Sequence, residues 1–471
     1  MATSLRDRWR SLDVLIGGSF GWWREVSPPQ LLVGSFLLLI VIGTLGLLVL
    51  PGLYTGERLG FLDALFTATS AVCITGLIVV DTATFFTFWG QLYLLVLIQL
   101  GGLGIMSIGT LLFVSLTGRQ PIRYRLLTRE TLGMPLSTDL GGLILRVVVL
   151  TLAIEAAGAL ALLLARLGDG PFTELLWWAV FHAVSGFCNA GIALQDGSLA
   201  PWAGDPAVLL TLAALILAGG LGFPVLLDLL RLQADDRDRR ALHFHTRLVL
   251  AATAVLVLGG TGFLWLSEYD NALAELPAGL GILNALFHSV SARTAGFSTL
   301  PVAHFTYPSL FMLLLLMFIG GGPCSTAGGV KVTTAAVLVL EGAALVRRRW
   351  QTAAFGRRIP TRVLATAAAV VAVYAVVLVT GILLMLVLEA HGRPHAESGG
   401  YFMDTVFEAF SALGTVGLST GLTGDLGEPA RLVVVGLMLL GRVGPLALAS
   451  LLLRGPAGPK IRYPESEVIV G

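Results

Sequence analysis

Charged residues are scarce in this chain, and lysine and cysteine are rarer still. Of 471 residues, 13% are charged and 56% hydrophobic, whereas a soluble domain has about 25% charged residues. The three cysteines, Cys73, Cys188 and Cys324, are odd in number and lack metal-binding spacing, so they predict neither a disulfide framework nor a zinc site. A net charge of +1 gives no indication of a nucleic-acid partner. The composition predicts a polytopic, all-α membrane protein.

Motifs for catalysis and nucleotide binding are also missing from the sequence. There is no P-loop and no Rossmann fingerprint, so any nucleotide control would come from another subunit. An intramembrane enzyme would need a convergent pair such as serine with lysine, or two mid-span aspartates, and the apolar runs show neither. We therefore expect a protein that is not an enzyme and that holds no organic cofactor of its own.

Long apolar runs are present in pairs. The expected spans lie at residues 31–50 and 88–116, 141–166 and 206–230, 246–267 and 308–346, and 361–389 and 429–453. About 28 polar and aromatic residues precede the first run, which favours a cytosolic N-terminal segment over a cleaved leader. Arginine clusters separate the pairs of spans, for example at Arg347–Arg349. Because basic loops stay on the cytoplasmic side, we expect both termini in the cytosol and the protein in the inner (cytoplasmic) membrane.

Between the two spans of each pair lies a short apolar stretch, and the four stretches resemble one another. They begin at Phe66, Phe181, Phe287 and Phe407 and end at Gly76, Gly191, Gly296 and Gly417. The third stretch is one residue shorter between its serine and its glycine. Four stretches in register with the topology indicate an internal repeat. A transporter with inverted repeats is the alternative, but its repeats would alternate in orientation, whereas each repeat here starts inside.

The repeats divide the chain into the following expected parts: a cytosolic segment 1–28, repeat 1 at 29–117, repeat 2 at 141–232, repeat 3 at 245–347 with an intramembrane loop at 318–330, repeat 4 at 361–453, and a cytosolic tail at 454–471. Each repeat is expected to be a span, a pore helix and a second span. The fold expected is a pseudo-fourfold arrangement of these repeats around a single pore.

The stretches are too short to cross a bilayer, at about 10–14 residues, which suggests re-entrant segments. Irregular backbone at membrane depth must be buried or line water, and four such segments around one axis would give rings of carbonyl oxygens that replace the hydration shell of K⁺. Glycine permits the backbone twist that this requires. The expected filter residues are Ile74, Thr75 and Gly76; Asn189, Ala190 and Gly191; Thr294, Ala295 and Gly296; and Thr415, Val416 and Gly417.

These stretches, the glycine-rich segment Gly320–Lys331, the sequence Gly441–Pro445 and the tail from Arg462 resemble the Trk/Ktr/HKT superfamily of potassium transporters, most closely its bacterial Ktr-type translocating subunits. The resemblance covers nearly the whole chain and implies potassium uptake. It also implies a homodimer with one pore per subunit and a cytosolic nucleotide-binding regulatory ring. Sodium stimulation is common in that superfamily. A serine at the position of Gly76 goes with sodium permeation in plant relatives, so Gly76 favours potassium.

The second span of repeat 3 contains several glycines and a proline, which cannot continue a helix. We expect a loop inside the membrane below the filter, and the resemblance implies that it is the gate; a static kink is the alternative. Lys331 and Arg442 are buried cations in this region, which could hold the gate against carbonyls or only tie the bundle together. The expected gate residues are Gly320, Gly321, Gly322, Ser325, Thr326, Gly328, Gly329, Lys331 and Arg442.

Three further features of the sequence concern residues near the filter stretches. Asp81 and Asp196 each follow a filter glycine by five residues and could form an acidic vestibule or be solvated loop residues. His182, His288 and Glu408 share one position of the pore helices, and we expect them to bond backbone at the helix start. By resemblance, Arg293 braces the filter.

Overall fold

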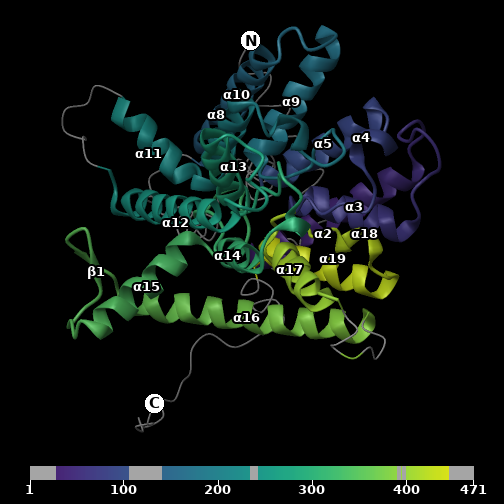
Figure 1. The fold of residues 1–471 in the computed structure, drawn as a ribbon. Helices are drawn as coiled ribbons and strands as arrows, with labels where there is room; N and C mark the ends of the chain where they lie inside the picture. The colour runs from purple at the N-terminus through teal and green to yellow at the C-terminus, as the bar shows by residue number, and fades with distance from the viewer. Residues whose placement is uncertain (1–27, 105–139, 234–241, 390–393, 395–398, 445–471) are drawn as a thin grey trace, which may run out of the picture.

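The computed structural model describes residues 28–104, 140–233, 242–389, 394 and 399–444 (Figure 1). The expected cytosolic tail and nearly all of the expected N-terminal segment lie outside these residues. The described part is helical apart from one hairpin, in which β1 (Ala353–Ala354) pairs with β2 (Arg357–Arg358), Ala353 opposite Arg358. The expected all-α class is confirmed.

The described helices are grouped below by the expected repeats, and the expected names of first span, pore helix and second span are kept for them. Repeat 1 has α2 (Pro28–Val49), α3 (Phe61–Cys73) and α5 (Phe88–Gly102); repeat 2 has α8 (Leu140–Ala165), α9 (Phe172–Cys188), α10 (Pro206–Leu221) and α11 (Phe223–Gln233); repeat 3 has α12 (Phe244–Glu268), α13 (Ala278–Ser291), α14 (Tyr307–Phe318) and α15 (Val332–Val346); repeat 4 has α16 (Thr361–Glu389), α17 (Tyr401–Gly414) and α19 (Glu428–Val443). After the filter stretches come the short helices α4 (Thr82–Phe85), η2 (Ala200–Trp202), η4 (Val302–His304) and α18 (Leu422–Asp425).

Three described helices are long and apolar enough to cross a membrane, namely Leu145–Ala165, Phe244–Glu268 and Thr361–Glu389. Their outward faces carry exposed apolar side chains such as Val149, Leu258 and Val376, as lipid contact requires. Of the expected second spans 88–116 and 429–453, the structure describes residues 88–104 and 429–444, and the helices there end at Gly102 and Val443.

The expected span 206–230 is bent in the structure, because α10 and α11 meet at an angle of 104°. The bend lies at Gly222, whose φ of 93° suits glycine. A β-carbon there would overlap the carbonyl oxygen of Pro323 in the glycine-rich loop. The span therefore turns aside where the loop of repeat 3 passes. The break expected in the span of repeat 3 is present, between Phe318 and Val332.

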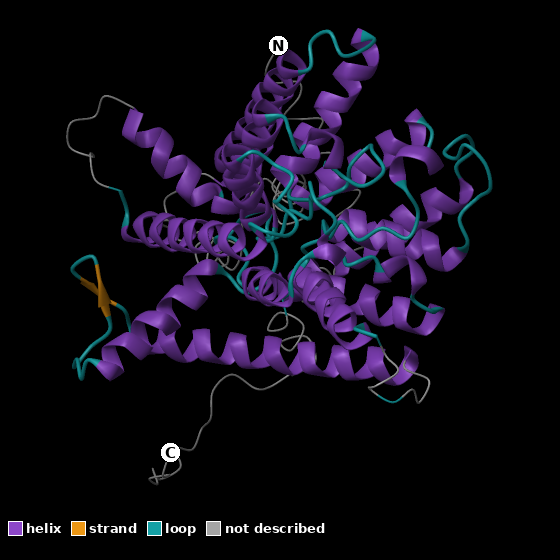
Figure 2. Ribbon diagram, in the orientation of Figure 1, coloured by secondary structure: helices purple, strands orange, loops and turns teal. Residues whose placement is uncertain are grey.

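The repeats pack in a closed cycle. The second span of each repeat contacts the pore helix of the next: α5 contacts α9, α10 contacts α13, α14 contacts α17, and α19 returns to α3. The loops after the pore helices converge at the centre of this cycle (Figure 2). The phenylalanine that begins each repeated stretch is fully buried in all four repeats, which explains its recurrence.

The junction of repeat 4 with repeat 1 is the only one of the four where the two repeats do not follow each other in the chain. Here Arg431, in the first turn of α19, donates from Nη1 to Asp63 Oδ1 of α3 at 2.6 Å. Further along α19, Arg442 donates to the carbonyl of Gly101 in α5 at 3.0 Å. Eleven residues are about three turns of helix, so both arginines lie on the face of α19 that closes the cycle.

Candidate ion-conduction site

The filter stretches share one backbone pattern. The first residue of each has a positive φ: Ile74 56°, Asn189 61°, Thr294 76° and Thr415 49°. The glycine two residues later has a positive φ as well, between 68° and 94°. The residue between them is not among those with a positive φ. Alternation of this kind turns successive carbonyls toward one side, which is what a carbonyl-lined filter requires.

The four filter glycines face one another. A β-carbon on Gly76 would overlap the carbonyl oxygen of Ala190, and the relation repeats around the cycle, from Gly191 to Ala295, from Gly296 to Val416 and from Gly417 to Thr75. Each glycine thus abuts the carbonyl of the residue before the next repeat's glycine. Only glycine fits at these positions, both for space and for φ.

One serine in each pore helix holds the filter strand that follows it. The middle filter residue donates its N–H to this serine's carbonyl at 2.8 Å in all four repeats (Thr75, Ala190, Ala295 and Val416). In repeats 1 and 4 the glycine N–H also donates to the serine hydroxyl, at 3.1 Å for Ser70 and 3.0 Å for Ser411. In repeats 2 and 3 the hydroxyl donates instead to the carbonyl after the glycine, at 2.8 Å for Ser185 and 2.5 Å for Ser291.

These bonds place the short third stretch in register. Ser291 is four residues before Ala295, whereas the other serines are five before their partners, and the bond is equally short. Beyond Ser291 the chain takes a tighter turn through Ala292, which stays in the right-handed region. The one-residue difference is thus absorbed before Thr294, which occupies the same position as Ile74.

The two ends of the glycine-rich loop, after α14 and before α15, lie side by side and are hydrogen-bonded to each other. Gly320 donates its N–H to the carbonyl of Val330 at 2.9 Å, and Val330 donates to Phe318 at 3.2 Å. The loop between these stems lies against the first filter residues, because β-carbons on Gly320 and Gly328 would contact Thr294 and overlap the hydroxyl of Thr415, respectively. All of the expected gate residues lie on this loop or contact it.

Three cations bond to carbonyls of this loop. Arg442 Nη1 donates to Thr326 O at 2.5 Å, and its Nη2 reaches Gly101 O in repeat 1. Lys331 Nζ donates to Ala327 O at 2.6 Å. Arg293 Nη2 donates to Gly320 O at 3.1 Å, so it braces the loop, where the resemblance had led us to expect a brace on the filter.

The loop is also bonded to repeat 2. Thr326 donates its hydroxyl to Phe187 O at 3.1 Å and its N–H to Gly219 O at 3.2 Å. Gly322 donates its N–H to Gly220 O at 2.7 Å. The loop is therefore held by groups from repeats 2 and 4 in addition to its own, and Arg442 links it indirectly to Gly101 of repeat 1.

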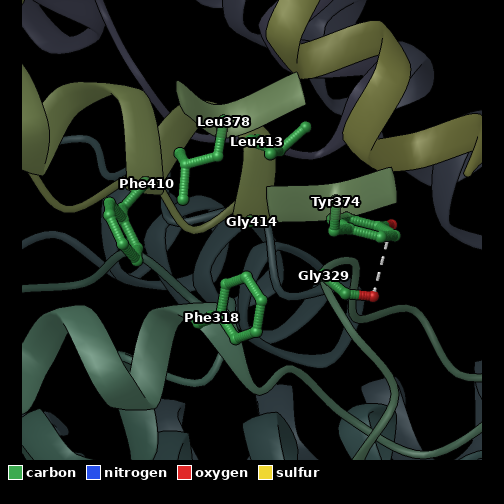
Figure 3. Close-up of a pocket in the computed structure, with 7 residues that line it drawn as sticks. All are labelled: Phe318, Gly329, Tyr374, Leu378, Phe410, Leu413 and Gly414. Carbon is green, nitrogen blue, oxygen red and sulfur yellow. Dashed lines mark hydrogen bonds between the residues drawn. The ribbon is translucent and has the colours of Figure 1, made fainter. Parts of the chain in front are cut away.

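Tyr374 of α16 is a contact that sequence reasoning missed. Its hydroxyl lies 3.4 Å from Gly329 O and 3.2 Å from Gly441 O, so it joins the loop to the last span (Figure 3). The tyrosine borders a small apolar pocket beside the loop, lined also by Phe318, Leu378, Phe410, Leu413 and Gly414. A tyrosine in an apolar span usually finds a hydrogen-bond partner, which is the signal that could have found it.

Glu155 was missed as well, although it interrupts the apolar run of α8. Its side chain is buried and accepts from Gln99 Nε2 of α5 at 3.1 Å, while Cys188 Sγ, at the end of pore helix α9, lies 3.8 Å from its other oxygen. An ionisable group inside a membrane span points to a functional site. This one ties two spans to the base of the second filter strand.

Of the two acidic residues that follow the filter glycines, Asp81 is hydrogen-bonded to the backbone of its own loop. Asp81 accepts from the N–H groups of Ala83 and Thr84 and so caps α4. Capping the start of a helix is a structural reason for an aspartate at this position, with no bound cation needed. This supports the reading of Asp81 as a loop residue.

Comparison with known proteins connects this architecture to a family. Residues 27–456 match TrkH, a family described as cation transport protein. The chain is 37% identical over 445 residues to Ktr system potassium uptake protein B of Vibrio alginolyticus, covering 94% of this chain and 95% of that protein. It is 35% identical to the protein of the same name from Bacillus subtilis strain 168 (95% and 98% covered). Potassium/sodium uptake protein NtpJ of Enterococcus hirae is also 35% identical (95% and 98% covered).

Among solved structures, the potassium transporter TrkH from Vibrio parahaemolyticus has the same fold. The TM-score is 0.70 at 22% identity, with 90% of this chain and 84% of that chain covered. The relatives are transporters, which confirms that this chain is a transport protein and not an enzyme. The match over nearly all of its length, the repeated helices and the similarity to these relatives together establish that the chain belongs to the TrkH family of membrane cation transport proteins.

Proposed function

We propose that this chain is the membrane pore of a potassium uptake system, in which carbonyls from the four filter stretches bind dehydrated K⁺. The observation that carries the proposal is the closed ring in which each filter glycine abuts a carbonyl of the next repeat. The uptake names of the similar proteins supply the ion and the direction. The family name alone would leave the cation open.

The experiment is ⁸⁶Rb⁺ uptake into K⁺-loaded proteoliposomes that contain only this chain. Uptake above that of empty vesicles, reduced by external K⁺ far more than by equal Na⁺, is the expected result. Equal inhibition by Na⁺ and K⁺ would contradict potassium selectivity. Because one relative is named a potassium/sodium uptake protein, the same assay with Na⁺ added at a constant K⁺ concentration also tests sodium stimulation.

The glycine-rich loop is proposed as the gate. It lies against Thr294 and Thr415, and its carbonyls are held by side chains from the surrounding helices. A segment held by a few separable bonds can take two arrangements, unlike a packed helix. In this proposal a cytosolic nucleotide-binding ring, docked on a homodimer of this chain with both termini inside, changes the gate's state.

Replacement of Arg442 with alanine is expected to raise Rb⁺ flux. Arg442 joins the loop to repeat 1 through two carbonyls, and a hydrogen bond to a charged group contributes about 1.5–3 kcal/mol. Loss of one such contribution shifts a closed-to-open equilibrium by about tenfold or more. The measurement is Rb⁺ flux in proteoliposomes for the variant and the parent.

Arg442→Lys is the matched control, because lysine keeps the charge but presents a single point donor rather than a fork. Its flux should lie between those of the parent and the alanine variant. Flux in the alanine variant at or below the parent's, with a normal elution volume in size-exclusion chromatography, would show that Arg442 does not hold the gate.

A further inference from the structure

The residue directly after the buried phenylalanine of each pore helix is polar, and in three repeats it is fully buried: His182, His288 and Glu408 are at most 1% exposed. The expectation that these groups serve the helix start is wrong. They lie ten residues after the first residue of α9 and α13 and seven after the first residue of α17. Each instead contacts the strand that leaves the filter on the outer side.

In repeat 4, Glu408 accepts two hydroxyl donors from the chain that follows the filter, one from the loop and one from α18. Ser419, two residues after the filter glycine, donates to Oε1, and Thr423 donates to Oε2 at 2.9 Å. Ser419 Oγ also accepts the N–H of Gly421 at 2.8 Å. The carboxyl group thus fixes the chain between Gly417 and α18 through three linked bonds.

In repeat 3, His288 contacts Thr299, three residues after the filter glycine, at 3.2 Å from Nε2 to Oγ1. The Thr299 hydroxyl donates a hydrogen bond to Asn284 Oδ1 at 2.6 Å. The orientation of this amide is fixed because Asn284 Nδ2 donates to Ala203 O and Leu280 O. Nε2 of His288 must therefore be the donor. Its Nδ1 has no partner among the described residues, which fits a neutral imidazole.

In repeat 2, His182 makes the same contact with the opposite tautomer. Nδ1 lies 2.8 Å from Trp178 O, which can only accept, so Nδ1 carries the proton. Nε2 then accepts the N–H of Leu194, again three residues after the filter glycine, at 3.4 Å. Repeat 1 has the shorter Thr67 at this position, and it is only partly buried.

We infer that His182, His288 and Glu408 are positioning residues that fix the outer ends of three filter strands to their pore helices. The inference rests on the proposed filter function. The serines hold the middle of each strand, so without a second attachment the outermost carbonyls could rotate. A buried side chain on a packed helix supplies that attachment, and Glu408 does so by accepting two hydroxyl donors.

The spacing within the chain supports a shared role. The partner of the brace lies 12, 11 and 11 residues after His182, His288 and Glu408, respectively. Three different groups, an imidazole acceptor, an imidazole donor and a carboxyl, reach the chain two or three residues after the filter glycine. A side chain retained only to fill space would not need a polar partner there.

The experiment compares Glu408→Leu, which keeps the size and removes both acceptors, with Glu408→Gln, which keeps one. Thr405→Val is the matched control, because Thr405 is a buried hydroxyl of the same helix that bonds only to its own helix, at Tyr401 O. In proteoliposomes, the Rb⁺/Na⁺ flux ratio should fall by about tenfold in the leucine variant. It should fall by less in the glutamine variant and stay at the parent's value in the control.

A second measurement does not depend on conduction. Hydrogen–deuterium exchange of the segment 415–426 should be faster in Glu408→Leu than in the parent or in Thr405→Val. Exchange and flux ratio both unchanged in a folded leucine variant would overturn the inference, and so would faster exchange with an unchanged ratio, since the group would then be structural only. If the parent itself shows no K⁺ preference, the proposed function fails, and the exchange result still decides whether Glu408 holds the strand.

Discussion

Serine in place of Gly76 is expected to lower the K⁺/Na⁺ flux ratio by about tenfold or more, because the filter carbonyls would have to move. The φ of Gly76 is 85°, and a β-carbon there would overlap the carbonyl oxygen of Ala190 in the next repeat. The displaced carbonyl belongs to the ring that takes the place of the ion's water. The measurement is Rb⁺ and Na⁺ flux in proteoliposomes.

Two further variants separate the causes of this effect. Gly76→Ala adds the β-carbon without a hydroxyl, so it should reduce selectivity too if displacement is the cause. Gly259→Ser is the control, since Gly259 lies in α12 with nothing within 4 Å of an added β-carbon. Parent-like selectivity in folded Gly76→Ser and Gly76→Ala proteins would refute the carbonyl ring at this position.

Deletion of residues 322–326 is expected to give the largest rise in Rb⁺ flux. It removes Thr326, which bonds Phe187 O, Gly219 O and Arg442. The stems at Phe318–Gly321 and Val330–Val332 bond each other and remain. Gly321 and Ala327 can be joined because they already approach closely across the loop. Without these bonds the shortened loop has less to hold it under the filter, so flux should also depend less on any regulatory partner.

Thr326→Val keeps the length of the loop and loses only its side-chain bond, so its flux should lie between those of the parent and the deletion. Flux in the deletion at or below the parent's, while size-exclusion chromatography shows intact assembly, would mean that the loop is scaffolding. The gate would then lie elsewhere.

The repeat pattern and the glycine-rich break could be found from the sequence because both depend on local chemistry. Glycine at a positive φ and proline in a span have the same consequence wherever they lie. The one-residue difference in the third stretch could not be placed, since only the bond from Ala295 to Ser291 shows where the chain tightens.

Contacts between distant parts of the chain were beyond sequence reasoning. Arg442 was found as a buried cation, but its partners lie 116 and 341 residues away and are backbone carbonyls, which have no sequence signature. The bend at Gly222 depends on the carbonyl of Pro323 in another repeat. Glu155, by contrast, carried a local signal, because it is an acidic residue within an apolar run.

The polar residue after the repeated phenylalanine was misplaced along its helix by sequence reasoning. His182, His288 and Glu408 were expected to bond backbone at a helix start, but they lie well inside the pore helices. The repeated stretch was aligned from its phenylalanine, while each pore helix begins several residues earlier. The partners of these three side chains lie 11 or 12 residues later, after the filter, and come close only because the chain folds back along the pore helix.

If all four repeats bind one ion between them, anomalous scattering from Rb⁺ in crystals of the protein should locate that ion. We expect Rb⁺ density on the axis enclosed by Gly76, Gly191, Gly296 and Gly417, within coordination distance of carbonyl oxygens from every repeat. Density between two subunits, or at surface carboxylates alone with an empty ring, would contradict it.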